Sequence, residues 1–195
     1  MDEVGTHGLA TGARAAMLRQ FQHTACRTAS LTELESAIPT RLPGWRVSEL
    51  VAHMTASLDL VLRSADAPAD DTEPSSPLHW YRNMDDFAEI IDGEARSAVK
   101  AGWVAVRAQF AQRLADTELQ LRAMKPSGHV RAGGDVMTLE DLCVTRCVEA
   151  VLHTYDLAQA LRASIPIDEH ALAVTRRFLT LADNGGRLVR PDLLT

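Results

Sequence analysis

The sequence contains few cysteines, hardly any lysine and no long apolar stretch. Its 195 residues include three cysteines, Cys26, Cys143 and Cys147, and only two lysines, Lys100 and Lys125. An odd number of cysteines without a secretory leader argues against a disulfide framework, so we expect all three to be buried thiols. No segment approaches the run of about 18 apolar residues that a membrane-spanning helix needs.

Positive charge is also scarce. The chain has 20 Lys and Arg residues against 26 Asp and Glu residues, which gives a formal net charge of −6. A broad surface for nucleic acid or for an acidic membrane usually requires a basic field, so neither partner is expected. The start of the chain, Met1-Asp2-Glu3, lacks the basic residues and the apolar centre of a signal peptide. We therefore expect a soluble, cytoplasmic protein.

Motifs for nucleotide binding and for serine hydrolysis are absent as well. The pair Gly133-Gly134 follows no predicted strand and fits neither the phosphate-binding loop nor the dinucleotide-binding pattern. The sequence contains no Gly-x-Ser-x-Gly, the pattern around the nucleophile of α/β-hydrolases. The candidate chemistry therefore depends on histidines and carboxylates.

Helical periodicity dominates the rest of the sequence. Apolar residues recur at helical spacing, and segments rich in proline and glycine separate the helices. Thr138 is a candidate N-cap with Asp141 three residues later, as in a capping box. Gly93 and Gly102 interrupt the third segment and predict a bend or a break there. The predicted helices cover residues 10–28, 47–64, 80–124, 138–163 and 168–183, and residues 65–77 and 125–137 are predicted to be loops.

Four principal helices and a shorter fifth, without convincing strand alternation, predict an all-α protein. We expect a four-helix bundle, either up-and-down or with a crossover connection, and an extra C-terminal helix. The length suits a single domain that spans residues 1–195. Bundles of this kind often hold metals between side chains of facing helices.

Glu149 and His153 are four residues apart in the fourth predicted helix, so they lie one above the other on one face. A carboxylate and an imidazole in this arrangement can bind a divalent metal together with a third ligand, although the spacing alone is common on helices. His53 is the candidate for that ligand, because apolar residues flank it in the second predicted helix. The alternatives are an exposed pair of Glu149 and His153, which contributes roughly a few tenths of a kcal/mol, and a structural role for His53.

Two residues close to this pair each have two interpretations. Asp156 either orients the imidazole of His153 through a hydrogen bond or has no role in the site. Arg146 either forms an ion pair with Glu149 or Glu140, or binds the carboxylate of a substrate.

Other residues near these segments are given structural roles or left open. Cys143 and Cys147 lie to the side of the face that carries Glu149, so we do not expect them to bind the same ion. Trp45 is expected to anchor its loop on the bundle. Residues 79–82, His-Trp-Tyr-Arg, either line the mouth of a pocket or simply begin a helix.

Two segments resemble a known family. LPGWRVSELVAH at residues 42–53 is similar to the motif that opens the second helix of mycothiol-dependent maleylpyruvate isomerases, and TRCVEAVLHTYDLA at residues 145–158 is similar to their second motif. The resemblance covers roughly residues 10–161 and extends to the DinB-like superfamily of four-helix metalloproteins. It implies a divalent metal, usually zinc, held by His53, Glu149 and His153.

The same resemblance implies the chemistry. An enzyme of this kind uses mycothiol as a thiol cosubstrate, and the thiolate adds to a small electrophile. The isomerases carry a further C-terminal α/β domain, whereas this sequence ends at Thr195, so we expect that domain to be absent. We therefore expect a mycothiol S-transferase in preference to a mycothiol-dependent isomerase.

Two other functions are compatible with the sequence. A non-catalytic helical binding or regulatory module would hold the metal structurally, but it would need a fourth protein ligand, which is not evident on the same helix faces. A metal-dependent hydrolase would activate water in place of a thiol. The acceptor substrate and the oligomeric state, a homodimer included, are left open.

Overall fold

The computed structural model describes residues 12–65, 73–82, 87–125 and 128–183. Helices make up most of this part of the chain and the strands only a short hairpin, which confirms the predicted all-α fold. Residues 10 and 11 of the first predicted helix lie outside the described residues. The four long helices are α2 (Ala13–Ala29), α4 (Val47–Ala65), α7 (Trp103–Ala123) and α8 (Leu139–Leu161), and the shorter ones are α3 (Glu33–Ser36), α5 (Pro77–Arg82), α6 (Ala88–Ala98) and α9 (Glu169–Asp183).

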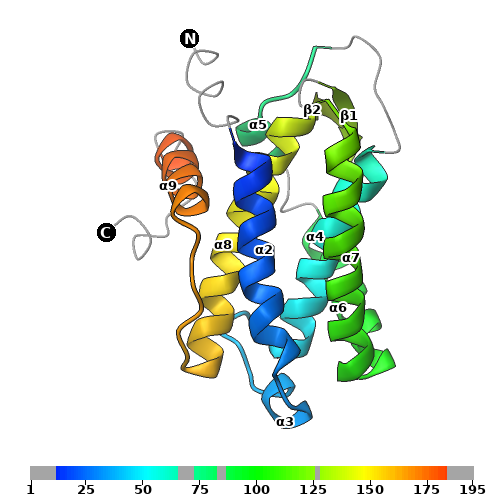
Figure 1. Ribbon diagram of the computed structural model, residues 1–195, viewed down its shortest axis with the longest axis vertical. Helices are drawn as coiled ribbons and strands as arrows, with labels where there is room; N and C mark the ends of the chain where they lie inside the picture. The colour runs from blue at the N-terminus through cyan, green and yellow to red at the C-terminus, as the bar shows by residue number, and fades with distance from the viewer. Residues whose placement is uncertain (1–11, 66–72, 83–86, 126–127, 184–195) are drawn as a thin grey trace.

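The four long helices form a closed bundle with a crossover. Each packs against two others, in the order α2, α8, α4, α7 around the bundle. In Figure 1, α2 and α8 run in one direction and α4 and α7 in the other. Because α4 and α7 are parallel, the chain must return along the bundle between them, and α6 packs on α4 within that connection. Of the two predicted topologies, the crossover form is therefore the one observed.

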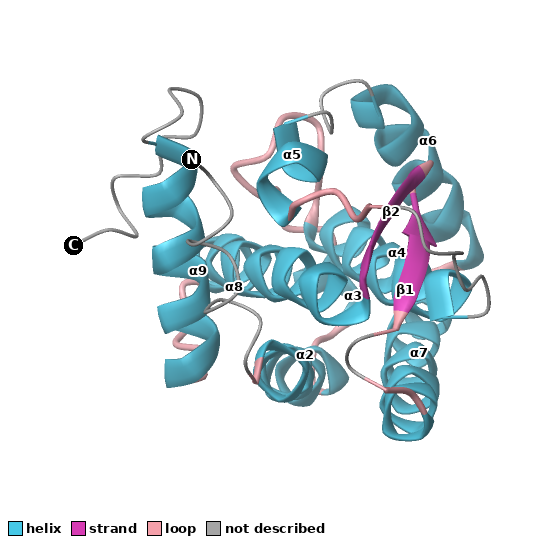
Figure 2. Ribbon diagram, turned by 90° about the horizontal axis from the view of Figure 1, so that it is seen from above, coloured by secondary structure: helices cyan, strands magenta, loops and turns pink. Residues whose placement is uncertain are grey.

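The fourth long helix, α8, is buried along most of its length. It packs against α2, α4, α5 and α9, and the view down the bundle shows it among them (Figure 2). Polar groups on such a helix need partners inside the protein. Thr154 finds them on α2, where its hydroxyl lies 3.0 Å from Nε2 of Gln20 and 2.8 Å from the hydroxyl of Thr24. Polar side chains of α8 therefore have their partners inside the protein, as Thr154 does on α2.

The third predicted helix is divided as the glycine at its centre suggests. Gly102, with φ of 87°, follows a single 3-10 turn, η2 (Val99–Ala101), and separates it from α7. Gly93 lies inside α6 and does not interrupt it. The start of α8 also agrees with the sequence, since the Thr138 hydroxyl accepts a hydrogen bond of 3.0 Å from the amide of Asp141.

The prediction of a loop at residues 125–137 was wrong, because most of this segment is a β-hairpin. β1 (His129–Ala132) pairs antiparallel with β2 (Asp135–Thr138). The turn between them is Gly133-Gly134, with φ of 58° and 93°, and a two-residue hairpin turn favours such positive φ values. A Cβ on Gly133 would lie 3.3 Å from Nε1 of Trp80, so the turn also approaches α5 closely.

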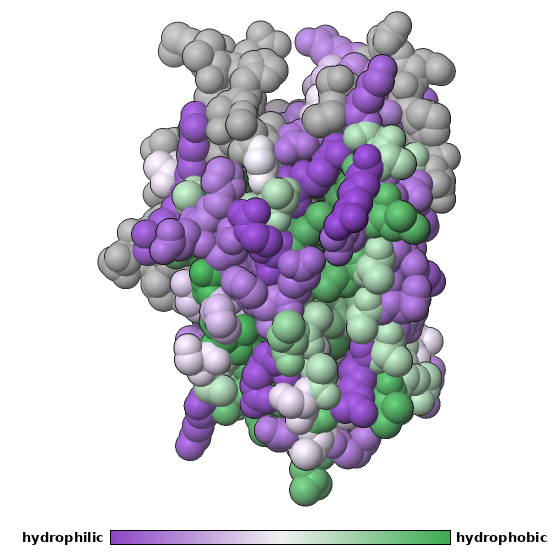
Figure 3. All heavy atoms as spheres, in the orientation of Figure 1, coloured by the Kyte–Doolittle hydropathy of each residue, from purple (hydrophilic) through white to green (hydrophobic). Residues whose placement is uncertain are grey.

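Few large apolar side chains are strongly exposed on the described surface. Figure 3 shows hydrophilic and hydrophobic side chains interspersed over one face of the bundle. Phe87 and Ile90, at the start of α6, are 37% and 58% exposed. None of the described helices combines the length and the apolar character needed to span a membrane. The other exposed large apolar residues are Leu34, Val104 and Leu119.

Candidate metal centre

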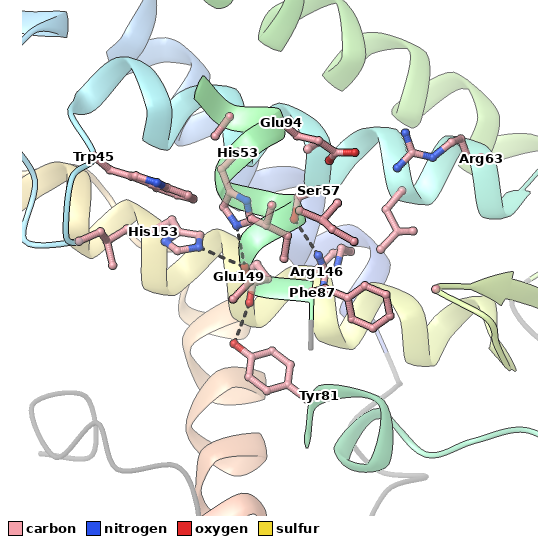
Figure 4. Close-up of a pocket in the computed structure, with 18 of the residues that line it drawn as sticks. Trp45, His53, Ser57, Arg63, Tyr81, Phe87, Glu94, Arg146, Glu149 and His153 are labelled. Carbon is pink, nitrogen blue, oxygen red and sulfur yellow. Dashed lines mark hydrogen bonds and ion pairs between the residues drawn. The ribbon is translucent and has the colours of Figure 1, made fainter. Parts of the chain in front are cut away.

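His53 on α4 faces Glu149 and His153 on α8, so the two helices bring together the three side chains singled out in the sequence (Figure 4). Oε2 of Glu149 lies 3.2 Å from Nε2 of His53 and 3.1 Å from Nε2 of His153. The two imidazoles are nearly perpendicular, with ring centroids 4.8 Å apart. One candidate ligand atom from each residue lies within 4.8 Å of the others.

A second group of side chains fixes the orientation of the first. Nδ1 of His153 lies 3.1 Å from Oδ2 of Asp156, which is 1% exposed and also forms an ion pair with Nε of Arg41. A neutral imidazole that donates its Nδ1 proton to a carboxylate presents the lone pair of Nε2 on its other side. Tyr81 on α5 donates a hydrogen bond of 2.7 Å to Oε1 of Glu149. Oε2 of Glu149 is left to face the histidines.

The pKa values of the three side chains are shifted in different directions, which gives them different charges. Burial lowers the pKa of His53 and outweighs its hydrogen bond to Glu149, so His53 is neutral near pH 7. Burial alone would raise the pKa of Glu149, but hydrogen bonds to His153 and His53 hold it well below its usual value. Burial alone would lower the pKa of His153, but hydrogen bonds to Asp156 and Glu149 raise it to about 9. A charged carboxylate is thus held between one neutral and one protonated imidazole.

The donor set suits a divalent metal such as zinc. Two imidazoles and a carboxylate are a common set of three protein ligands in catalytic zinc sites, where a fourth position is open to water or substrate. The contact between His153 and Asp156 is the outer-sphere arrangement typical of zinc-binding histidines. Within the described ranges, no fourth His, Cys, Asp or Glu joins the group. The residues therefore fit an open site better than a closed structural one.

The cluster lies on the wall of a partly open cavity of about 640 Å³, lined mainly by residues of α4, α6 and α8 together with Tyr81 of α5. Much of the lining is apolar, and α6 contributes Ile90 and Ile91 to it. Trp45 covers the end of the cavity at His53, with its ring 5.2 Å from the His53 ring and its Nε1 donating to Oδ1 of Asp92 on α6. Trp45 therefore does more than anchor its loop, because it connects the site to α6.

Arg146 also lines the cavity, but neither ion pair considered for it is observed. Glu140 contacts Arg14 instead, with 3.6 Å between Nε and Oε2. Nη1 of Arg146 donates to the Ser57 hydroxyl at 2.9 Å and its Nε donates to the Thr145 hydroxyl at 3.2 Å. The guanidinium also lies 4.8 Å from the centre of the Trp80 ring.

The cysteines lie away from the cluster. Cys143 and Cys147 are fully buried, and burial raises the pKa of Cys143 to about 12 and raises that of Cys147 as well. Neither lines the cavity. The expectation of a buried thiol was wrong for Cys26, which is exposed because it lies on the outer face of α2.

Tyr81 is a residue of the site whose contact with Glu149 the sequence did not predict. It lies in the segment 79–82, which was left open between a pocket mouth and a helix start, and it proves to line the cavity and to contact Glu149. The signal was the position of an aromatic hydroxyl within a short helix after a loop. Only the packing of α5 against α8 and α9 shows where that hydroxyl points.

The chain matches the family model described as the mycothiol maleylpyruvate isomerase N-terminal domain over residues 17–158. A crystal structure of the mycothiol-dependent maleylpyruvate isomerase matches with a TM-score of 0.61 and 17% identity, over 87% of this chain and 67% of that chain. A histidine-to-alanine mutant of such an isomerase matches with a TM-score of 0.61 and 16% identity, over 86% and 67%. At this identity the likeness shows a shared fold. No curated protein matches the chain significantly.

Proposed function

The chain belongs to the family of mycothiol maleylpyruvate isomerase N-terminal domains, and from this premise we propose that it is a zinc-dependent enzyme that uses mycothiol to attack a small electrophile. The observation that carries the proposal is the convergence of His53, Glu149 and His153 on the wall of one cavity. If the thiol adduct is released, the enzyme is an S-transferase. If the adduct rotates about the former double bond and expels the thiol, it is an isomerase.

Each ligand atom follows from a contact in the site. His153 would bind the metal through Nε2, because Nδ1 faces Asp156. Glu149 would bind through Oε2, because Oε1 accepts from Tyr81. His53 would bind through Nε2, which points to the same carboxylate oxygen. A bound zinc ion would supply a Lewis acid that lowers the pKa of a thiol and keeps it as a thiolate near neutral pH.

The cavity lining supports a nucleophile from outside the chain. Among the described residues that line it there is no cysteine and no lysine. The hydroxyl of Ser57 accepts from Arg146, and none of the described histidines or carboxylates forms a hydrogen bond with it as a base would. The thiol sulfur must therefore come from a cosubstrate. Apolar lining residues such as Leu60 and Ile91 would exclude water from the reacting groups, which strengthens the electrostatic interactions among them.

The test is turnover of electrophiles by the zinc-loaded protein with and without mycothiol. A panel of activated alkenes, epoxides and alkyl halides is incubated with each mixture, and both thiol consumption and product formation are followed. We expect turnover only when thiol and metal are both present. Equal turnover without thiol would favour metal-activated water, and an absence of turnover across the panel and across hydrolysable esters and amides would favour a non-catalytic module.

A matched pair of histidine variants makes the test specific to the site. His153→Ala should abolish thiol-dependent turnover while the helical circular dichroism spectrum is preserved. His79→Ala changes an exposed histidine of α5 that does not line the cavity, so it should retain the activity. Loss of activity in both variants, or in neither, would contradict the assignment of the metal site.

A further inference from the structure

The most unusual charged group in the cavity is the guanidinium of Arg146. The residue is 4% exposed, and its two hydrogen-bond acceptors are the neutral hydroxyls of Ser57 and Thr145. In the part of the chain that the structure describes, no carboxylate lies within ion-pair distance of it. Burial lowers the pKa of Arg146, but arginine stays charged at neutral pH. A buried cation without an anionic partner is costly, so a partner from outside the chain would stabilise it.

The surroundings hold the guanidinium in one orientation. The Ser57 hydroxyl, on α4, is 3% exposed and lies 2.9 Å from Nη1, and the Trp80 ring covers the guanidinium at 4.8 Å. Figure 4 shows Arg146 reaching from α8 toward Ser57, and Glu149 and Phe87 line the same cavity. Because its position is fixed by contacts on three elements, little side-chain entropy would be lost when it binds an anion.

One nitrogen of the guanidinium is accessible from the cavity. Nε and Nη1 donate to the two hydroxyls. Nη2 donates to no described residue, and it is not fully buried. Arg146 lines the same cavity as the three candidate ligands. An anionic group that accepts from Nη2 would therefore share one space with a reactant at the metal centre.

The charges around the cavity also favour an anion. Asp156 is paired with Arg41, and the exposed Arg63 and Glu94 on the lining have opposite signs. Glu149 faces the two imidazoles and Tyr81, and in the metal-bound protein its charge would be more than balanced by a divalent cation. The charge of Arg146 then has no counterpart among the described residues, and a thiolate bound to the metal would leave room for a second negative group.

We propose that Arg146 is the anion-binding residue of the cavity and that it selects an electrophile that carries a carboxylate. The carboxylate would accept from Nη2, and the apolar lining formed by Phe87 and Ile91 would contact the carbon skeleton between the carboxylate and the reacting carbon. This inference rests on the proposed function for its reaction, but the binding site itself consists of residues of this chain.

The test measures binding and not turnover. 3-Phenylpropionate and its neutral amide, 3-phenylpropanamide, are titrated into the full chain by isothermal calorimetry, with and without zinc. Both forms of the protein should bind the carboxylate about ten- to a hundredfold more tightly than the amide, as expected for a hydrogen-bonded charge pair. Equal affinity for the two probes would overturn the proposal. A preference found only with zinc would show that the metal, and not Arg146, binds the carboxylate.

Variants then assign the preference to one residue. Arg146→Met should remove most of the preference and leave amide binding within about twofold of wild type, and Arg146→Lys should retain part of the preference because it keeps the charge without the planar fork. Arg131→Met removes the same charge from an exposed position on β1 and should change nothing. An equal loss for carboxylate and amide in the Met variant would mean that Arg146 only shapes the wall.

The conclusion does not depend on one variant. If Arg146→Met fails to fold, Ser57→Ala removes the acceptor of Nη1 and should lower carboxylate affinity severalfold, with little effect on the amide. An unchanged carboxylate affinity in Ser57→Ala and Arg146→Lys together would overturn the proposal. Because no thiol is present, failure here with thiol-dependent turnover intact would reject the anion site alone, and the opposite outcome would reject the proposed reaction alone.

Discussion

The two faces of α8 both pack inside the protein, yet they differ in chemistry. The face toward α4 and α5 carries Arg146, Glu149 and His153, and all three line the cavity. The face toward α2 and α9 carries Cys147 and Thr154, each 0% exposed and in contact with neighbouring helices. On the second face the protein supplies every partner: the Thr154 hydroxyl bonds to Gln20, Thr24 and the backbone of its own helix. The first face directs charged groups into an open space.

The comparison shows that burial alone does not identify a functional residue. Burial raises the pKa of Cys143 to about 12, which leaves an inert thiol. Burial acts on Glu149 in the same direction, but two imidazoles reverse its effect and keep the carboxylate charged. A functional face therefore needs converging partners of opposite charge as well as burial. The following predictions test this difference through one quantity, the affinity for zinc.

The largest effect is expected for Glu149→Gln, which removes the charged ligand from the cavity face. Outer contacts of zinc sites are typically worth about 10–100-fold in metal affinity, so loss of a direct ligand should exceed about a hundredfold. Competition with a fluorescent chelator measures it. Glu140→Gln, in the first turn of the same helix, is the matched control and should bind zinc as wild type does. Similar affinities for the two variants would remove the distinction between the faces.

Acidity should change the zinc affinity of the cavity face by a predictable amount. The native pKa of His153 is raised to about 9 in the metal-free protein, so below that pH a proton must leave before zinc binds. Zinc affinity should therefore rise about tenfold per pH unit up to about pH 9 and level off above it. Chelator competition across pH 6 to 10 checks the slope, and an affinity independent of pH would contradict the protonated state of His153.

The same shift affects the stability of the metal-free protein. Because the folded pKa of His153 lies above its value of 6.5 in the unfolded chain, the proton stabilises the fold fully below pH 6.5. That contribution is lost as the pH rises through about 9. His153→Ala should remove this part of the pH dependence from urea unfolding curves.

Intermediate effects are expected from the residues that orient the ligands. Asp156→Asn keeps the shape of the side chain but removes the charge that holds Nδ1 of His153, so zinc affinity should fall about 10–100-fold.

Tyr81→Phe removes one hydrogen bond to Glu149, and a fall in zinc affinity of about tenfold is expected. Tyr155→Phe changes a tyrosine of α8 that does not line the cavity and serves as the control. Equal affinities for Tyr81→Phe and Tyr155→Phe would contradict the orienting role.

The smallest effect on zinc affinity is expected from the opposite face. Replacing both Cys143 and Cys147 by Ala should leave zinc affinity within about twofold of wild type, while the free energy of unfolding falls by about 1–3 kcal/mol through lost packing. Urea unfolding and chelator competition give the two quantities. A folded double variant that has lost its zinc would show that the thiols bind the metal.

The sequence predicts the helices well where spacing and breakers agree. The apolar stripe of α4 and the cap at Thr138 follow from local rules that the structure obeys. The hairpin was missed because each strand has only four residues, too few for alternation to be recognised, although Gly133-Gly134 is a turn signal. Exposure of Cys26 was missed because it depends on which face of α2 meets its neighbours.

In the candidate site, too, the contacts within one helix could be predicted from the sequence and those between helices could not. Glu149 and His153 are paired by helical spacing, and Asp156 follows one turn later, so their proximity is local. His53 was a candidate because apolar residues flank it and because the resemblance implies it, but its approach to the pair depends on α4 packing beside α8. The contacts of Tyr81 with Glu149 and of Arg146 with Ser57 depend on tertiary packing, which no spacing in one sequence encodes.

X-ray absorption spectroscopy of the zinc-loaded protein tests the metal centre most directly. Without added thiol, the fine structure should show only nitrogen and oxygen neighbours at about 2.0–2.2 Å, including the scattering pattern of two imidazoles. After mycothiol is added, one sulfur should appear at about 2.3 Å. A sulfur neighbour before thiol is added, or a shell without imidazole scattering, would contradict binding by His53, Glu149 and His153.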